Sequence, residues 1–310
     1  SMIGISKLLC DASFAHDPLR YGRHARGDVK DAHRMPPSAA ERKPVVVWNM
    51  TRTCNLKCIH CYTDSDAKKY EGELPTEAVR ATLEDLAAFQ VPALLMSGGE
   101  PLVHPEFWDH ANYARELGLR CVLSTNATLI TAEVAARLKE IGLTYVGASL
   151  DGIGPVNNQF RGKPWAYDRA VEGIRNCKKN GIRISLRMTL TKHNAEDLDV
   201  IFEFVRQEKV ERVCFYHLAY AGRGRGLVGD DQSREEARAT VEQIFEKTRA
   251  LHDDGLETDV LTVDNHCDGP FMYLKLLEAE PKRADAVREL LEWNGGGAHS
   301  SGGAIGDIDF

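Results

Sequence analysis

The chain lacks the features that would assign it to several specialised classes of protein. Its 310 residues contain no apolar run of the roughly 18 residues that a membrane-spanning helix needs, no signal-peptide core at the start and no low-complexity tract. Positive charge is not in excess, because 39 Lys and Arg are outnumbered by 46 Asp and Glu and the net charge is −7. We therefore expect a cytoplasmic protein that has neither nucleic acid nor a membrane as a partner.

Cysteine is too scarce for a disulfide-based scaffold, since the chain has 8 in 310 residues. Cys121 and Cys214 lie in apolar, strand-like runs, and we expect them to be small buried side chains. Only three cysteines lie close together in the sequence, and they are Cys54, Cys58 and Cys61. These three are the candidates for a shared chemical role.

A repeated glycine punctuates the chain and indicates its secondary structure. Gly118, Gly142, Gly181 and Gly255 each end a helical pattern, where a left-handed residue is favoured, and each precedes a short apolar run. Apolar runs predict strands at residues 44–51, 93–97, 119–125, 145–150, 182–190 and 212–219. Helical periodicity predicts helices between them, at 76–90, 105–117, 131–141, 166–180 and 194–208.

This alternation of strand and helix predicts an α/β fold with parallel strands and right-handed crossovers. Six units suffice for a partial, open (β/α)6 barrel of the TIM type, which we assign to residues 44–220. Residues 1–43, whose periodicity is weak, are expected to form an N-terminal arm or lid. Residues 221–310 are expected to form an extension with helices at 233–254 and 282–293, a strand at 257–263 and a glycine- and serine-rich end.

The three cysteines fall within eight residues and need a common partner, because residues 51–62 read Thr-Arg-Thr-Cys-Asn-Leu-Lys-Cys-Ile-His-Cys-Tyr. A structural zinc site needs four protein ligands and has no open position. Here the fourth ligand would have to be His60 or a distant residue. A four-iron cluster on three thiolates keeps one iron open for a small molecule. The motif also follows the first strand, at the edge where barrels of this kind carry their active sites. We therefore favour an iron–sulfur cluster on Cys54, Cys58 and Cys61.

The cysteine spacing and a second motif, Ser-Gly-Gly-Glu-Pro at 97–101, together resemble the radical SAM (S-adenosyl-L-methionine) superfamily. The similarity covers about residues 44–220. It implies a partial (β/α)6 barrel, a [4Fe-4S] cluster, SAM bound at the open iron, and reductive cleavage of SAM to a 5′-deoxyadenosyl radical. In such an enzyme the cofactors perform the radical chemistry, and the protein orients and shields them.

The resemblance also assigns SAM-binding roles to individual residues. Gly98 and Gly99 would let the backbone approach the methionine part of SAM, and Glu100 would accept a hydrogen bond from its ammonium group. Arg187 would bind the SAM carboxylate, with a structural salt bridge as the open alternative. His60 takes a position at which relatives often pack an aromatic ring on adenine. Three further residues, Asn126, Ser149 and Asp151, suit the ribose hydroxyls of SAM. Tyr62, which follows the last cysteine, is also assigned to the cofactor site.

Shorter strings resemble enzymes of the alternative heme pathway and of heme d1 synthesis. They lie at residues 2–8 and 20–22, at 44–50, and at 215–218 together with 222–224. This resemblance, which is strongest to the 12,18-didecarboxysiroheme deacetylases, implies an enzyme of heme (porphyrin) biosynthesis. Such an enzyme removes acetate side chains from an iron tetrapyrrole and forms iron-coproporphyrin III. The resemblance also implies a low-potential electron donor, which the sequence does not identify.

Other functions stay open at this point. Near relatives include a heme d1 synthesis enzyme, which removes propionates, a coproheme-type oxidative decarboxylase, and SPASM-type peptide-modifying maturases. An iron–sulfur electron carrier and a zinc module are the non-enzyme alternatives, although a simple carrier normally supplies a fourth cysteine.

Arginines that follow the predicted strands are candidates for binding substrate carboxylates, because guanidinium groups bind carboxylates bidentately. They are Arg161, Arg223 and Arg225, with a further basic group at 20–26 in the N-terminal arm. Relatives also carry a cysteine-rich C-terminal extension that binds a second [4Fe-4S] cluster. No such cysteine group precedes Phe310. We therefore expect a shortened form, with a second cluster only in a full-length protein.

Overall fold

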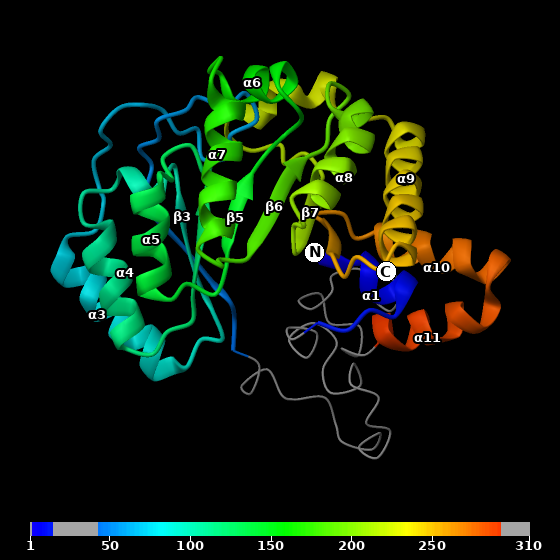
Figure 1. The fold of residues 1–310 in the computed structure, drawn as a ribbon, viewed down its shortest axis with the longest axis horizontal. Coiled ribbons are helices and arrows are strands. Elements are labelled where there is room, and N and C mark those ends of the chain that lie inside the picture. The colour runs from blue at the N-terminus through cyan, green and yellow to red at the C-terminus, as the bar shows by residue number, and fades with distance from the viewer. Residues whose placement is uncertain (1, 15–42, 293–310) are drawn as a thin grey trace.

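A single sheet organises the fold, and its strands are β1 Met2–Gly4, β2 Val46–Thr51, β3 Leu94–Gly98, β4 Cys121–Thr125, β5 Val146–Ser149, β6 Ile184–Thr189, β7 Arg212–Tyr216 and β8 Asp259–Val263. The computed structural model describes residues 2–14 and 43–292 (Figure 1). Strand order is β1-β8-β7-β6-β5-β4-β3-β2. Strands β2 to β8 are parallel, and β1 pairs antiparallel with β8. The basic group at 20–26 and the glycine-rich end at 294–310 lie outside the described residues.

Helices cover the outer face of this sheet, as the alternating pattern predicts (Figure 1). They include α3 Thr76–Phe89, α4 Phe107–Glu116, α5 Ala132–Ile141, α7 Ala166–Lys179, α8 Leu198–Gln207 and α9 Arg234–Asp253. Local signals account for their ends: Ser233 and Glu236 form a capping box at the start of α9. Gly118, Gly142 and Gly181 follow α4, α5 and α7 with left-handed φ of 80°, 76° and 66°. The predicted partial barrel is confirmed, with two further strands at one edge.

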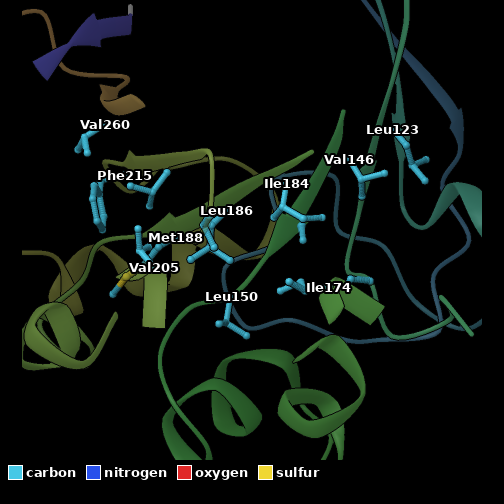
Figure 2. Packing of buried hydrophobic residues seen from close by; sticks show 14 of the residues in the cluster. Leu123, Val146, Leu150, Ile174, Ile184, Leu186, Met188, Val205, Phe215 and Val260 are labelled. Atoms are coloured by element: carbon cyan, nitrogen blue, oxygen red, sulfur yellow. The ribbon is translucent and has the colours of Figure 1, made fainter. Parts of the chain in front are cut away.

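The two faces of the sheet differ in chemistry. On the outer face, apolar side chains such as Leu123, Val146 and Leu186 are 0% exposed and pack against the helices (Figure 2). Burial of such side chains is the main favourable term in folding. The alternate residues of the same strands point to the inner face, because successive side chains in a strand alternate. They form two neighbouring rows, Ser124, Gly147, Ser185, Arg212 and Asp259, and Ser149, Arg187, Cys214 and Leu261.

The first residues of the chain belong to the sheet rather than to an arm. Strand β1 is followed by α1 Ile5–Cys10, which packs on β8 and α9. Within α1, Ile5 and Leu8 are 0% exposed. The Ser6 hydroxyl donates a hydrogen bond to Thr258 O and accepts one from Val260 N, both at 2.8 Å. A helix of 6 residues is too short to show a helical period, which is why the sequence pattern does not reveal it.

Further elements follow β5, β7 and β8, and most of them were not predicted. Helix α6 Pro155–Arg161 follows β5, a short 3-10 helix η5 Gly222–Asp230 follows β7, and α10 Asp268–Ala279 with α11 Pro281–Glu292 follows β8. Of these, only α11 was predicted, at 282–293, together with β8 and α9. No helix in residues 2–14 and 43–292 is both long and apolar enough to cross a membrane.

Candidate active site

The three motif cysteines lie on one loop at the carboxyl edge of the sheet, directly after β2. We call residues 52–66 the cysteine loop. Cys54 and Cys58 are buried, Cys61 is partly exposed, and all three are free thiols. They share a small apolar cluster with Leu56 and Ala166 that is separate from the main core. In the described ranges, no three His, Cys, Asp or Glu side chains converge closely enough to hold a single metal ion.

Each of the three sulfurs has a hydrogen-bond donor beside it. Backbone N–H groups lie 3.4 Å from the sulfurs of Cys54 and Cys61. The third sulfur, of Cys58, lies 3.6 Å from Arg161 Nη1. Donors of this kind stabilise thiolate charge and tune iron–sulfur clusters. The residues present therefore fit a [4Fe-4S] cluster held by three thiolates.

A buried ion pair supports the loop from the far side. Asp151, at the end of β5, is 0% exposed and pairs with the Arg161 guanidinium at the end of α6. His60 Nε2 lies 3.3 Å from the same carboxylate, and Thr189 N donates to its other oxygen at 2.8 Å. Burial is the largest influence on the His60 imidazole and lowers its pKa, which favours the neutral ring. The Asp151 carboxylate thus serves Arg161 and His60, which differs from our expectation that it binds ribose.

A glycine–arginine–glycine turn at the start of η5 fastens the cysteine loop to the end of β7. Arg223 donates from Nε to Cys58 O at 2.7 Å. Its Nη1 donates to Asp64 Oδ1, also at 2.7 Å. Gly222 has a φ of 52°, and a Cβ at this position would lie 2.5 Å from Tyr62 O. Only glycine permits so close an approach of two backbones.

The same arginine acts on the thiol of Cys61. Burial raises the pKa of Cys61, but hydrogen bonds from Thr63 and Ser65 and the charge of Arg223 outweigh it, so the pKa lies below its usual value. Our expectation that Arg161 and Arg223 bind substrate carboxylates stays a prediction, and the structure shows contacts of both with the loop. Both guanidinium groups are already engaged by the loop and its supports.

The two glycines of the second motif allow another close approach. Gly98 has a φ of 135° and would place a Cβ 3.1 Å from Thr51 N, while a Cβ on Gly99 would lie 2.7 Å from Arg52 O. The backbone of Gly99 donates to Thr51 O at 2.7 Å. In the structure these glycines therefore join the end of β3 to the start of the cysteine loop.

Glu100 supports the end of β4. Its buried carboxylate accepts hydrogen bonds from Thr125 Oγ1 at 2.7 Å and from Asn126 N at 2.8 Å. Burial raises the pKa of Glu100 to about 7. Asn126 in turn donates to Asn55 Oδ1 at 2.8 Å and lies 3.8 Å from Cys54 Sγ. Asn126 therefore contacts the cysteine loop itself, and Asn55 is a partner that the sequence reasoning missed although it follows Cys54 directly.

The remaining predicted residues lie at different depths. Tyr62 is 53% exposed beside the last cysteine, and Arg225 is exposed on η5. Ser149 is partly exposed at the end of β5 and is the register partner of Arg187. Arg187 donates to Ser124 Oγ on the inner face of the sheet. In the described part of the chain its side chain contacts Ser124 on β4 and lies near Tyr145, Cys214 and Tyr216, not near the cysteine loop.

The partial barrel and the three-thiol loop define an enzyme that works with an iron–sulfur cluster and SAM. A family model described as the Radical SAM superfamily matches residues 48–205, and the chain belongs to this superfamily. It is therefore an enzyme, rather than an electron carrier or a zinc module, and its cofactors are a [4Fe-4S] cluster and SAM.

Known relatives place the chain more finely. It is 50% identical to the Fe-coproporphyrin III synthase of Methanosarcina barkeri, over 100% of this chain and 76% of that protein. It is 38% identical to the pre-heme d1 synthase of Dinoroseobacter shibae, over 89% of this chain and 69% of that protein. The crystal structure of Streptococcus suis SuiB bound to S-adenosylmethionine matches with a TM-score of 0.60 and 18% identity, over 77% of this chain and 52% of that chain. At that identity the likeness shows the shared fold alone.

Proposed function

We propose that this enzyme removes acetate side chains from 12,18-didecarboxysiroheme, an iron tetrapyrrole, and so forms iron-coproporphyrin III in heme biosynthesis. One observation carries the proposal: 50% identity to an Fe-coproporphyrin III synthase extends over 309 residues. The matched length includes the cysteine loop, the inner face of the sheet and the elements that follow β7. All parts of this chain that form the site are thus similar to the Fe-coproporphyrin III synthase, which supports the same function for both proteins.

The cluster and SAM, when bound, supply a 5′-deoxyadenosyl radical. The protein contributes the geometry. Cys54, Cys58 and Cys61 hold the cluster, and the donors beside their sulfurs offset the thiolate charge. Arg223 holds the loop against the rim of the barrel. Cys54 and Cys58 are buried, which limits the access of water to that side of the cluster.

SAM binding is proposed along the carboxyl edge, next to the open side of the cluster. Gly98 and Gly99 are partly exposed there, and so is Ser149 at the end of β5. The exposed ring of Tyr62 directly follows the last cysteine. These groups can reach a ligand, whereas Glu100 and Asp151 are 0% exposed and hydrogen-bonded within the protein.

Further parts of the proposal concern the setting of the reaction. A low-potential electron donor reduces the cluster, and the reaction takes place in the cytoplasm without nucleic acid or a membrane as partner. Arg225, which is exposed on η5, remains a candidate for contact with a substrate carboxylate.

A second candidate function is the removal of propionates, as in heme d1 synthesis, because the identity to a pre-heme d1 synthase is 38%. The test incubates the reconstituted, reduced protein with SAM and 12,18-didecarboxysiroheme under anaerobic conditions and identifies the products by mass. Loss of acetates to give iron-coproporphyrin III supports the first proposal, and loss of propionates supports the second. Cys58→Ala serves as the matched control and should give neither product. An unchanged tetrapyrrole with the native enzyme would count against both proposals.

A further inference from the structure

An arginine without a carboxylate beside it lies on the inner face of the sheet. We propose that Arg187 binds a carboxylate of the iron tetrapyrrole inside the partial barrel, and does not bind SAM. This inference rests on the proposed function and specifies its substrate site. The alternatives are that Arg187 binds the SAM carboxylate or that it has a purely structural role.

Strand register places the Arg187 guanidinium inside the barrel. The residue itself is level with Ser149, the last residue of β5. Its guanidinium extends over Gly147, where a Cβ would lie only 2.6 Å from Arg187 Cζ. Gly147 precedes Ser149 by two residues, which corresponds to roughly 7 Å along a strand. The charge therefore lies below the rim of the barrel, on the inner face, and the glycine makes room for it.

The surroundings of this guanidinium are hydroxyl and thiol groups rather than carboxylates. Arg187 donates from Nη1 to Ser124 Oγ, and the phenols of Tyr145 and Tyr216 and the thiol of Cys214 are also close enough to interact with its charge. Its Nε has no hydrogen-bond partner in the described part of the chain. Ser124 and Tyr216 are partly exposed. A partly buried cation whose buried Nε lacks a partner among the described residues is suited to pair with an anion that enters the barrel.

The neighbouring arginine of the inner face shows the contrast. Arg212 lies in the adjacent row, and its Nε is 2.9 Å from Asp259 Oδ2 on β8. The protein thus supplies a carboxylate for one inner-face arginine. Among the described residues it supplies none within ion-pair distance of the other. A propionate of the tetrapyrrole, which is a carboxylate on a flexible two-carbon arm, would complete the second pair.

Other arginines are closer to the cofactor. Arg161 lies 3.6 Å from Cys58 Sγ, and Arg223 binds Cys58 O. Arg187 is bound instead to β4 and lies among residues of β7 and the residue before β5. Arg161 and Arg223 therefore supply the positive charge beside the cluster loop. Arg187 is available for a ligand that reaches into the barrel.

The test uses iron-coproporphyrin III, which carries four propionates, and its tetramethyl ester, which carries no anionic charge. Binding of each is followed by anaerobic absorbance titration of the reconstituted full chain, and SAM binding is measured separately. We expect Arg187→Met to weaken binding of the acid by about tenfold or more, as for loss of a charge-assisted hydrogen bond. We expect binding of the ester and of SAM to stay unchanged. Arg183→Met, which changes an exposed arginine just before β6, is the matched control and should leave all three affinities unchanged.

Arg187→Lys keeps the charge and guards against misfolding of the Met variant, and melting curves are recorded for both. The Lys variant should bind the acid with intermediate affinity, because an ammonium cannot bind a carboxylate bidentately. Weaker SAM binding in either variant would overturn the inference. So would equal binding of the acid by native, Met and Lys proteins, since it would leave Arg187 a structural role only. Failure of the native enzyme to bind the acid would instead overturn the proposed function, and this inference with it.

Discussion

The cysteine loop and the inner face of the sheet both carry arginines, but they use them differently. In the loop, Arg161 is paired with Asp151 and Arg223 with Asp64. On the inner face, Arg187 has hydroxyl and thiol groups around it and no carboxylate partner in the described part of the chain. The difference teaches that the cofactor end is organised by the protein's own contacts before anything binds. On the inner face, the Arg187 guanidinium has no carboxylate partner of its own among the described residues and is available to a ligand.

Removal of a cluster ligand should have the largest effect on this arrangement. Cys58→Ala should abolish the broad visible absorbance of anaerobically reconstituted protein, because two thiolates do not hold a stable cubane. The native protein should contain about four irons per chain, as one [4Fe-4S] cluster requires. Cys267→Ala, which changes an exposed cysteine away from the loop, is the control and should retain both absorbance and iron. Loss of the absorbance in the control would show that the ligand set is wrong.

The buried ion pair under the loop should give the next largest effect. Asp151→Asn removes the counterion of a buried arginine and should destabilise the protein by about 3–5 kcal/mol, since an uncompensated buried charge is costly. Asp64→Asn breaks the exposed pair with Arg223 and should cost less than about 1 kcal/mol. Urea denaturation of the cluster-free proteins measures both. Equal losses of stability would contradict the view that Asp151 anchors the loop.

The glycine turn at η5 offers a matched pair of substitutions. A Cβ on Gly222 would collide with the backbone of the cysteine loop at a left-handed φ, whereas a Cβ on Gly226 meets nothing within 4 Å. Gly222→Ala should therefore cost about 2–4 kcal/mol and lower the iron content, while Gly226→Ala should be nearly neutral. Urea denaturation and iron analysis, run on both variants, provide the measurement. Identical behaviour of the two variants would show that the turn does not fasten the loop.

The smallest of these effects concerns pH and the buried Glu100. Its folded pKa of about 7 lies above its ordinary value of 4.5, so the folded state holds the proton more tightly than the unfolded state. The resulting stability is present at low pH and is lost as pH rises through 7. Between pH 5 and 7 the native protein should lose about 1–2 kcal/mol more than Glu100→Gln, which cannot titrate there. Parallel pH slopes in urea denaturation would refute the assignment.

The sequence predicted those parts of the molecule whose signal is local. The cysteine spacing marked the cofactor loop, and glycines that end helices marked the strand–helix units. It could not predict the partners of the loop, because Arg161 and Arg223 are 103 and 165 residues away from Cys58 along the chain. Because both follow predicted strands, the sequence assigned them to substrate carboxylates, and only the folded arrangement shows their contacts with Cys58.

The direction of a side chain on a strand has a similar limit. An arginine in an apolar run indicates that a partner is needed, but the sequence does not say which face it points to. The register of β5, β6 and β7 turns Arg187 toward Gly147 and Ser124, inside the barrel. Likewise, β1 and α1 are too short for a periodic pattern, and they are defined by their packing on β8.

The account assigns the cysteine loop to the cofactors and Arg187 on the inner face to the substrate. The most direct test of this assignment measures SAM cleavage in the absence of tetrapyrrole. Reconstituted, dithionite-reduced protein is incubated with SAM, and 5′-deoxyadenosine is quantified for the native chain, Cys58→Ala and Arg187→Met. The account predicts equal formation by the native and Arg187→Met proteins and none by Cys58→Ala. Loss of 5′-deoxyadenosine formation in Arg187→Met, with the cluster intact, would contradict it, because the inner-face arginine would then belong to the cofactor site.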